Sequence, residues 1–490
     1  DWSTLSRDAF PAKEFDFMLS NPPYGKSWKN DLKKMGGKEN IRDPRFKAML
    51  GNEELSFVTR TNDGQMLFLA NMISKMNHKS ELGSRIAEVH NGSSLFTGDA
   101  GQGESNIRRW IIENDWLEAI IALPLNIFYN TGIATYIWVI TNRKPEHRKG
   151  KVQLIDATEW YKPLRKNLGK KNCELSEDDI KKICDTYLNF KETEQSKIFD
   201  NKAFGYWKII VERPLRLYSQ FTNKSIENLR FNSGDEDIRS MLYDEFGNDL
   251  FERFGTIKKK VKDWLDNFEE DEGNEEEFEE EEKEKKKRGI SEKKKNKLLD
   301  ANTWKKDAAL VDIAFEFKKK MGDELYKDHN EFRKKIIEIA ESMKYKVSKT
   351  ELKEIINAVS CREESAPPVI KKIHKIGKIK PEPLYGLFEM AINGESVIVE
   401  YEPDSELRDT EQIPLLEKGG IEEYFKREVL TYTPDAWIDK NKTNIGYEIS
   451  FTKHFYKPQP LRSLEEIIED IKKIQKESER LLDDLIRGEK

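Results

Sequence analysis

Residues 21–24 read Asn-Pro-Pro-Tyr and bring together two hydrogen-bond acceptors and a flat ring. Asn21 offers a side-chain carbonyl, and Pro22 offers a backbone carbonyl while lacking an N–H of its own. Pro22 and Pro23 stiffen the turn, so both acceptors are presented in fixed positions. Tyr24 offers a ring on which a nucleic acid base can stack, worth about 1 to 3 kcal/mol. The tetrad therefore suits chemistry on a planar amine that is held by its two hydrogens.

An aromatic amine is a weak nucleophile because its lone pair is delocalised into the ring. Two acceptors aimed at its hydrogens hold the nitrogen in place and make it more nucleophilic, which favours transfer of a carbon group to an exocyclic amine. Such a step depends on positioning and needs no general base with a shifted pKa. A base in duplex DNA would have to be flipped out first, at a cost of about a few kcal/mol. The four residues alone could also be a strand-terminating turn without catalytic function.

The elements around the tetrad predict an α/β domain with a mostly parallel sheet. The apolar run 15–20 stops at Asn21 and is typical of a buried strand that ends in a turn. Ligands of such sheets bind at the carboxyl ends of the strands, which is where this tetrad falls. Further strands are expected at 84–90, 117–122, 134–141 and 151–155, and helices at 66–76, 107–114 and 178–188.

A chain of 490 residues is too long for a single core, so several domains are expected. We expect half of a catalytic domain over 1–150, a mixed α/β extension over 151–265, a charged linker over 266–299 and a mainly helical C-terminal domain over 300–490. Asn393-Gly394 between two apolar runs predicts a β-hairpin in the last of these. The final segment, 464–486, has apolar residues at helical spacing and predicts an amphipathic helix that could bind a partner.

The composition limits the other kinds of site. The formal net charge of -6 offers no broad basic surface for nucleic acid, so such a surface must be local. Three widely spaced cysteines, six scattered histidines and the lack of a P-loop pattern predict neither a metal site nor nucleotide hydrolysis. Reduced thiols, with no signal peptide and no long apolar run, indicate a cytoplasmic protein.

The stretch Phe15-Asp16-Phe17-Met18-Leu19-Ser20-Asn21-Pro22-Pro23-Tyr24-Gly25 resembles the catalytic motif of gamma-class N6-adenine DNA methyltransferases. Asp63-Gly64-Gln65 and the segment 123–133 follow in that family's order, and the series is similar to the M subunits of type I restriction-modification systems. The resemblance implies S-adenosylmethionine as methyl donor and double-stranded DNA as substrate. It also implies a specificity subunit and a restriction subunit as partners. Phe128 matches the aromatic residue that packs on the flipped adenine opposite Tyr24, although it could instead be a core residue at a strand-loop junction.

One departure from the family concerns the methyl donor. The family's glycine-rich cofactor loop precedes the tetrad, and no such loop occurs upstream of Asn21. Asp1-Trp2 could match the acidic and aromatic pair that holds the cofactor's adenine, and the segment 98–103 is interpreted as a flexible loop. The chain is therefore expected to be a C-terminal portion of an M subunit whose cofactor residues lie mostly upstream, and to be inactive alone.

Two other functions remain open at this point. The same tetrad suits methylation of a glutamine side chain in a protein or of a base in ribosomal RNA. The chain could also be a truncated, non-catalytic scaffold that binds a specificity subunit.

Overall fold

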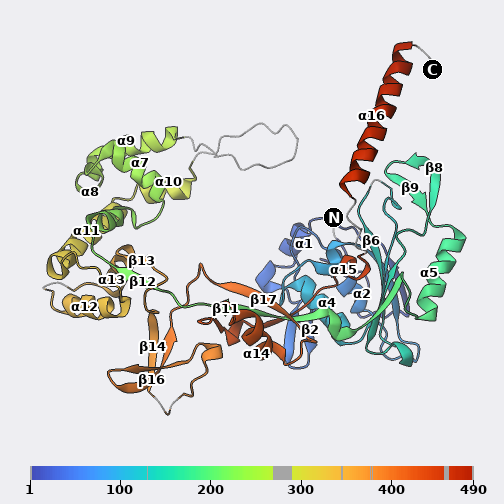
Figure 1. Ribbon diagram of the computed structural model, residues 1–490, viewed down its shortest axis with the longest axis horizontal. Helices are drawn as coiled ribbons and strands as arrows, with labels where there is room; N and C mark the ends of the chain where they lie inside the picture. The colour runs from blue at the N-terminus through green and yellow to red at the C-terminus, as the bar shows by residue number, and fades with distance from the viewer. Residues whose placement is uncertain are drawn as a thin grey trace. The chain divides into compact units, whose positions relative to one another are not determined.

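The computed structural model describes residues 3–129, 131–268, 290–343, 346–375, 377, 379–456 and 463–487. The chain forms two compact units (Figure 1). Unit 1 comprises Asp1–Lys208, Gln412–Tyr424 and Thr443–Lys490, and unit 2 comprises Ile209–Glu411 and Phe425–Lys442. Asp1-Trp2 and most of the predicted charged linker lie outside the described residues.

Unit 1 is built on a six-stranded sheet in the order β1-β4-β6-β5-β7-β10. Parallel pairs join β1 to β4 and β5 to β7, whereas β6 is antiparallel to both β4 and β5, and β10 is antiparallel to β7. Four of the six strands thus run in one direction, which confirms the expected α/β fold with a mostly parallel sheet. The strands are β1 (Phe17–Ser20), β4 (Arg85–Asn91), β5 (Leu117–Ala122), β6 (Thr135–Thr141), β7 (Lys151–Asp156) and β10 (Ser196–Asp200).

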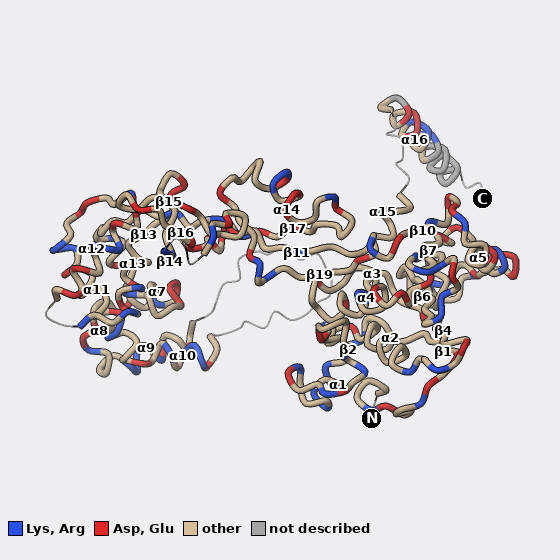
Figure 2. The backbone as a smooth tube through the Cα atoms, turned by 90° about the horizontal axis from the view of Figure 1, so that it is seen from below, with Lys and Arg blue, Asp and Glu red and all other residues tan. Residues whose placement is uncertain are grey.

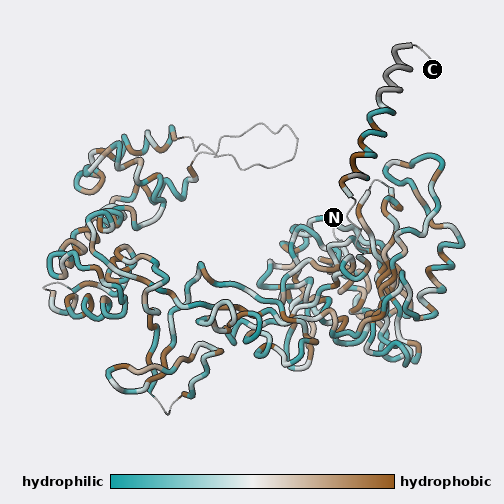
Figure 3. Tube along the Cα trace, in the orientation of Figure 1, coloured by the Kyte–Doolittle hydropathy of each residue, from teal (hydrophilic) through white to brown (hydrophobic). Residues whose placement is uncertain are grey.

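The centre of this sheet is apolar on both faces. Every residue of β5 is buried, as expected for a strand covered on two sides. Helices α2 (Gln65–Ile73) and α4 (Gly103–Glu113) pack on one face, and α5 (Glu177–Asn189) packs on the other. Figure 3 shows the hydrophobic residues gathered along these central strands. The sheet therefore provides a rigid base for the loops at its edge.

Strand β1 is the edge strand of this sheet in the described part of the chain, with β4 as its one neighbour. Met18 packs into the core, whereas Phe17 and Leu19 on the opposite face are 75% and 86% exposed. The strand register pairs Ser20, the last residue of β1, with Glu88. Strand β4 continues to Asn91, so β1 ends, and the tetrad follows, three residues before β4 ends.

Most predicted elements of unit 1 occur within a few residues of their predicted bounds. Helix α4 begins at Gly103, four residues before the predicted start at 107. The antiparallel hairpin β8–β9 and strand β10 were not predicted. The other α-helices and strands that lie wholly in unit 1 are α1 (Lys29–Lys34), β2 (Lys47–Leu50), β3 (Glu53–Ser56), α3 (Ser93–Phe96), β8 (Lys162–Leu168), β9 (Lys171–Glu174), α14 (Gly420–Tyr424), β19 (Asn444–Tyr447), α15 (Phe451–Phe455) and α16 (Leu464–Arg487).

Unit 2 is largely helical and contains the predicted hairpin. Strands β15 (Phe388–Ile392) and β16 (Glu395–Tyr401) pair antiparallel around Asn393 and Gly394, whose φ values are 53° and 81°. Two positive φ values are what a two-residue hairpin turn requires. The expectation of helices with a β-hairpin in the C-terminal part is thus confirmed. The principal helices are α7 (Glu236–Phe246), α9 (Phe254–Asn267), α11 (Ala301–Met321), α12 (His329–Glu341) and α13 (Lys349–Ala358), and the principal remaining strands are β12 (Leu217–Ser219), β13 (Ser360–Arg362) and β14 (Ile370–Lys375).

Among the described residues, none of the helices combines the length and the apolar character that a membrane crossing demands.

Candidate functional site

The tetrad forms the loop that leaves the carboxyl end of β1. Pro22 is buried, whereas the Asn21 side chain is exposed. Within the described part of the chain, neither the Asn21 side chain nor the Pro22 carbonyl has a hydrogen-bond partner. Both acceptors are therefore free to receive hydrogens from an incoming amine.

The downstream end of the tetrad loop is fixed to the segment before α2. Ser27 Oγ donates to the Thr61 carbonyl at 2.9 Å, and the Trp28 backbone N–H donates to the same oxygen at 3.0 Å. The buried Trp28 indole donates through Nε1 to the Arg60 carbonyl at 2.7 Å. Gly64 allows this close approach, because a Cβ there would lie 3.3 Å from side-chain atoms of Leu5 and Trp28. The loop is thus held at both ends.

Tyr24 is half-buried at the end of the tetrad, and burial raises the pKa of its phenol. The side chain therefore stays neutral and presents an uncharged ring. Gly25 follows with φ of 67°, a conformation that glycine adopts without strain. This turn redirects the chain directly after the ring.

Gln65 ties the start of α2 to the end of β4. Its Oε1 accepts from the Asn91 backbone N–H at 3.2 Å and lies 3.1 Å from His90 Nδ1. Its Nε2 donates to Asn91 Oδ1 at 2.6 Å, to Ser93 Oγ at 2.9 Å and to Asp63 Oδ2 at 2.9 Å. Because β4 is the neighbour of β1, this network stiffens the sheet edge beside the tetrad. Sequence reasoning assigned no role to these residues, although Asp63-Gly64-Gln65 before an apolar helix was a visible signal.

Glu88 and His90 lie on β4 beneath this network and are fully buried. Glu88 Oε2 and His90 Nε2 are 3.4 Å apart. Within the described chain, neither the two oxygens of Glu88 nor His90 Nε2 has a hydrogen-bond partner. Burying polar side-chain atoms without a hydrogen bond costs free energy, so this pair is not a source of stability for the sheet edge.

Phe128 lies on the loop after β5, and the hairpin β8–β9 fixes that loop. The Asn172 backbone N–H donates to the Asn126 carbonyl at 3.2 Å, and Cys173 Sγ donates to the Leu125 carbonyl at 3.2 Å. Phe128 is half-buried against the apolar cluster under α5, near Trp160. Part of the Phe128 side chain is therefore buried in the hydrophobic core.

Strand order sets the distance that Phe128 has to cover to reach a base on Tyr24. Strands β4 and β6 lie between β1 and β5. Three strand spacings amount to about 14 Å. Two rings that sandwich a base are about 7 to 8 Å apart, at ordinary carbon contact distances. The loops after β1 and β5 must therefore lean toward each other for both rings to touch one base.

The segment before the tetrad lacks the glycine-rich loop that the family resemblance predicts for S-adenosylmethionine. The first twenty residues contain no glycine, so no glycine-rich loop precedes the tetrad. Arg45 binds the segment after residue 3 instead, donating to the carbonyls of Thr4 at 2.8 Å and Leu5 at 2.9 Å.

The glycine-rich segment 98–103 serves the packing of α4. The guanidinium of Arg108 donates to the Thr97 carbonyl at 2.8 Å and to the Gly98 carbonyl at 3.4 Å. A Cβ on Gly103 would lie 2.3 Å from the Val58 carbonyl oxygen. These contacts hold residues 98–103 in place, although the sequence had led us to interpret this segment as a flexible loop.

No group of three or more His, Cys, Asp or Glu side chains in the described ranges is arranged to hold a metal ion. Cys173 is buried, and burial raises the pKa of its thiol, while Cys184 and Cys361 are exposed.

Residues 2–203 match the N-6 DNA Methylase family. The chain is 28% identical over 265 residues to the type I restriction enzyme MjaIX methylase subunit of Methanocaldococcus jannaschii, which covers 53% of this chain and 43% of that protein. It is 30% identical over 185 residues to the MjaVII methylase subunit of the same organism, covering 37% of this chain and 28% of that protein. A crystal structure of the type I restriction-modification methyltransferase subunit from Streptococcus thermophilus matches with a TM-score of 0.33 and 24% identity, covering 41% of this chain and 38% of the other.

The chain thus spans less than half the length of these curated relatives. Their names confirm the resemblance to M subunits of type I systems that the motifs indicated.

Proposed function

We propose, from the match of residues 2–203 to the N-6 DNA methylase family, that this chain is the catalytic portion of a type I M subunit. Its reaction is transfer of a methyl group to N6 of an adenine in DNA. The observation that carries the proposal is the free pair of acceptors, Asn21 and Pro22, in a fixed loop at the carboxyl end of β1. A planar amine with two hydrogens is the group that such a pair holds best.

In this proposal the chain's residues position the amine and leave the chemistry to the methyl donor. Asn21 Oδ1 and the Pro22 carbonyl each accept one N6 hydrogen, which fixes the nitrogen and directs its lone pair out of the ring. Tyr24 stacks on one face of the flipped adenine, and Phe128 packs on the other. Stacking of about 1 to 3 kcal/mol for each ring offsets the unstacking of the base from the duplex.

S-adenosylmethionine is the methyl donor that we propose, and it supplies an electrophilic methyl group when bound.

The proposed partners are double-stranded DNA and the specificity and restriction subunits of the same system, in the cytoplasm. Lys and Arg are interspersed with Asp and Glu along the described chain (Figure 2). A specificity subunit would therefore have to provide much of the affinity for the DNA phosphates. Helix α16 is the segment that we propose for binding that subunit. Its first turns expose Ile467, Ile471 and Ile474, whose spacing of four and three residues places them on one face of the helix. Figure 3 shows hydrophobic residues along this part of the chain. A strongly amphipathic helix with an exposed stripe is suited to packing on a partner helix.

The test is Asn21→Ala in the assembled methyltransferase. Loss of one acceptor should lower incorporation of labelled methyl groups into plasmid DNA by at least about a hundredfold, the scale observed when one hydrogen-bonding group at a reacting centre is removed. Asn52→Ala provides a matched control, since Asn52 is an exposed asparagine at the turn after β2. Substantial activity of the Asn21→Ala enzyme would contradict the proposal.

The substrate class can be separated in the same assay. Plasmid DNA, ribosomal RNA and a glutamine-containing release factor are offered in parallel to the wild-type assembly. Methylation of DNA alone supports the proposal, and methylation of either other substrate replaces it. Assembly with a specificity subunit without any methylation would identify the chain as a scaffold.

A further inference from the structure

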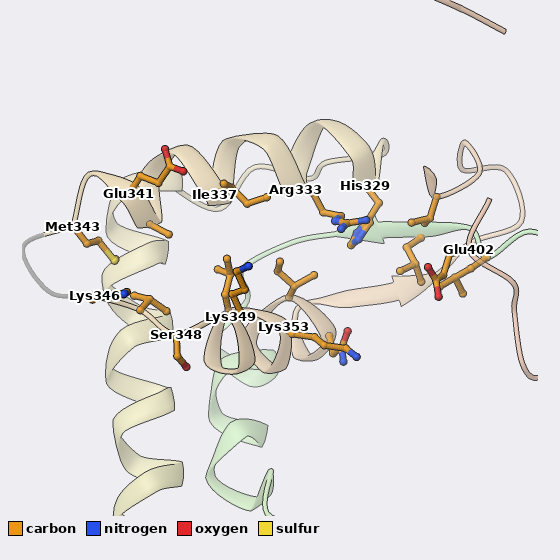
Figure 4. A pocket seen from close by; sticks show the side chains of 18 residues that line it. His329, Arg333, Ile337, Glu341, Met343, Lys346, Ser348, Lys349, Lys353 and Glu402 are labelled. Carbon is orange, nitrogen blue, oxygen red and sulfur yellow. The ribbon is translucent and has the colours of Figure 1, made fainter. Parts of the chain in front are cut away.

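Unit 2 contains a cavity of about 1040 Å³ between helices α12 and α13 (Figure 4). Helix α12 contributes Arg333, Ile337, Ala340 and Glu341 to its lining, a spacing of four, seven and eight residues from the first. Residues at this spacing share one face of a helix. The cavity is therefore a groove that follows the axis of α12.

Helix α13 lines the opposite wall with the same kind of row. Lys349, Leu352, Lys353 and Ile356 follow one another at three, four and seven residues from the first. Two facing rows of this kind form the ridges into which the side chains of a third helix can pack.

The floor of the groove is apolar. Leu215, two residues before β12, Leu217, its first residue, and the buried Val369 also line the cavity. Ile337 is 41% exposed on the wall, and Val347 and Leu352 are half-buried. An occupant with an apolar face would cover these side chains and remove their surface from water.

The rim of the groove is cationic. Lys346, Lys349 and Lys353 have no ion-pair partner among the described residues, and Arg333 donates only to the Ile370 carbonyl, at 3.3 Å. The lining includes two carboxylates, Glu341 and Glu402, against these four cations. In Figure 4 the lysines lie along the α13 side of the groove. An occupant with acidic flanks would complement this rim.

The dimensions fit a short helix. The α13 row from Lys349 to Ile356 is about 10 to 12 Å long at 1.5 Å per residue, and the α12 row is similar. A helical segment about 10 Å across and about 15 Å long occupies about 1200 Å³, close to the volume of the groove.

We propose that the groove between α12 and α13 binds an amphipathic helix of a partner protein, with its apolar stripe on the floor and its carboxylates against the lysine rim. Duplex DNA would also meet the lysines, but its phosphate backbone offers nothing to the apolar floor. This inference does not depend on the proposed methyltransferase activity.

The experiment measures binding of a fluorescent peptide to the full chain by anisotropy. The probe is a peptide of about 14 residues with leucines at i, i+3, i+4 and i+7 and glutamates on both flanks, stapled because so short a helix is marginal by itself. The expected result is saturable binding that weakens at least about tenfold in the triple variant K346E/K349E/K353E and in Ile337→Glu. Replacing the glutamates of the peptide by lysines should weaken binding to the wild type by at least as much.

The control is the triple variant K258E/K259E/K260E, which makes the same charge change on exposed lysines of α9 in the same unit. It should bind the acidic peptide like the wild type, and melting curves of all variants should coincide. The proposal is overturned by absence of binding at about 200 μM peptide, by equal binding of the lysine peptide, or by equal loss in the α9 control. It is also overturned if a labelled DNA duplex binds, loses affinity in K346E/K349E/K353E and displaces the peptide.

Discussion

An unpaired carbonyl oxygen at a loop surface is hydrogen-bonded to water, so a ligand donor can replace that water at little cost in free energy. A buried carbonyl without a partner has no water to bind, and it destabilises the fold. Asn21 is exposed, so water can satisfy its amide where the described chain offers no partner. Pro22 is buried, and its ring fixes the backbone of the loop. In the proposed site, Asn21 would thus provide the accessible acceptor and Pro22 the rigid turn.

Replacing Tyr24 tests the stacking role directly. Tyr24→Ala should lower kcat/KM for DNA methylation by about 5- to 150-fold, which corresponds to the loss of about 1 to 3 kcal/mol of base stacking. Tyr24→Phe keeps the ring and should stay within about threefold of the wild type. The measurement is methyl incorporation over a range of DNA concentrations. A Phe variant as impaired as the Ala variant would show that the hydroxyl, and not the ring, is what the reaction needs.

His329 predicts a pH dependence for unit 2. Burial, assisted by the nearby Arg333 charge, lowers the pKa of His329 from 6.5 to about 4. The unfolded chain therefore binds a proton that the folded chain does not between these two values, so stability is fully present above about pH 6.5 and is lost as the pH falls toward 4. A tenfold change in proton affinity is worth about 1.4 kcal/mol, so the whole effect is on the order of 3 kcal/mol.

The measurement is urea denaturation of the wild type and of His329→Gln at pH 7.5 and at pH 5. The variant should lose less stability than the wild type on acidification, because it lacks the titrating group. Parallel losses in both proteins would assign the acid sensitivity to the carboxylates instead. The Nδ1 atom of His329 lies 2.8 Å from Ser219 Oγ, so the glutamine also retains a group that can hydrogen bond there.

At the scale of elements, the connection between α4 and the segment before α2 depends on a glycine. Gly103→Ala should destabilise unit 1 by about 1 to 3 kcal/mol, because the new Cβ would lie 2.3 Å from the Val58 carbonyl oxygen and the backbone would have to move. The matched change Gly255→Ala, in helix α9, meets no atom within 4 Å and should be neutral or slightly stabilising. Urea denaturation of the two variants checks both signs, and a neutral Gly103→Ala would contradict the packing described here.

How accurately the sequence predicted an element depends on whether burial or long-range pairing determines it. Strands β5 and β7 were predicted within one residue, because each carries several β-favouring or apolar residues and is almost wholly buried. The hairpin β8–β9 was missed because most of its residues are exposed, so no burial alternation marks it. The position of β6 between β4 and β5 cannot be read from periodicity, since pairing partners are chosen by long-range contacts.

The candidate site was likewise predicted only in part from the sequence. The tetrad was found because its residue types and spacing have a chemical meaning by themselves. The Gln65 network was missed because three of its four partners, His90, Asn91 and Ser93, lie more than twenty residues away, and only folding brings them together. The roles of Asn21, Pro22, Pro23, Tyr24 and Phe128 remain predictions that the variants above test.

At the scale of the whole molecule, distant segments share one unit. Arg108 Nε donates to the Tyr447 carbonyl at 2.6 Å, across 339 residues of sequence. Burial lowers the pKa of Arg108 to about 10, so its guanidinium remains charged at neutral pH and donates to four carbonyl groups, three within residues 94–98 and one at Tyr447. Composition shifts along the chain could not reveal this return of residues 443–490 to unit 1. The boundaries at 150, 265 and 299 remain predictions about separately folding domains.

Calorimetry of the whole chain tests the expected lack of a cofactor site. Titration with S-adenosylmethionine should give no binding heat up to about 1 mM, a concentration at which even a weak complex of about −4 kcal/mol would be half-saturated. An M subunit that carries the glycine-rich loop serves as the positive control. Micromolar binding by this chain would show that its own residues form the pocket, and the assignment of the cofactor loop to another segment would then be wrong.

The insertion of β6 between β4 and β5 also bears on synthesis of the protein. Strands β4 and β5 leave the ribosome before β6, yet they have no ladder to each other and are joined only through it. Until residue 141 has emerged, the half of the sheet that carries the tetrad and the half that carries Phe128 are held by no common hydrogen bonds between strands. The nascent chain thus exposes the edges of β4 and β5 to other polypeptides for as long as translation takes to pass this point, at about 5 to 20 residues per second.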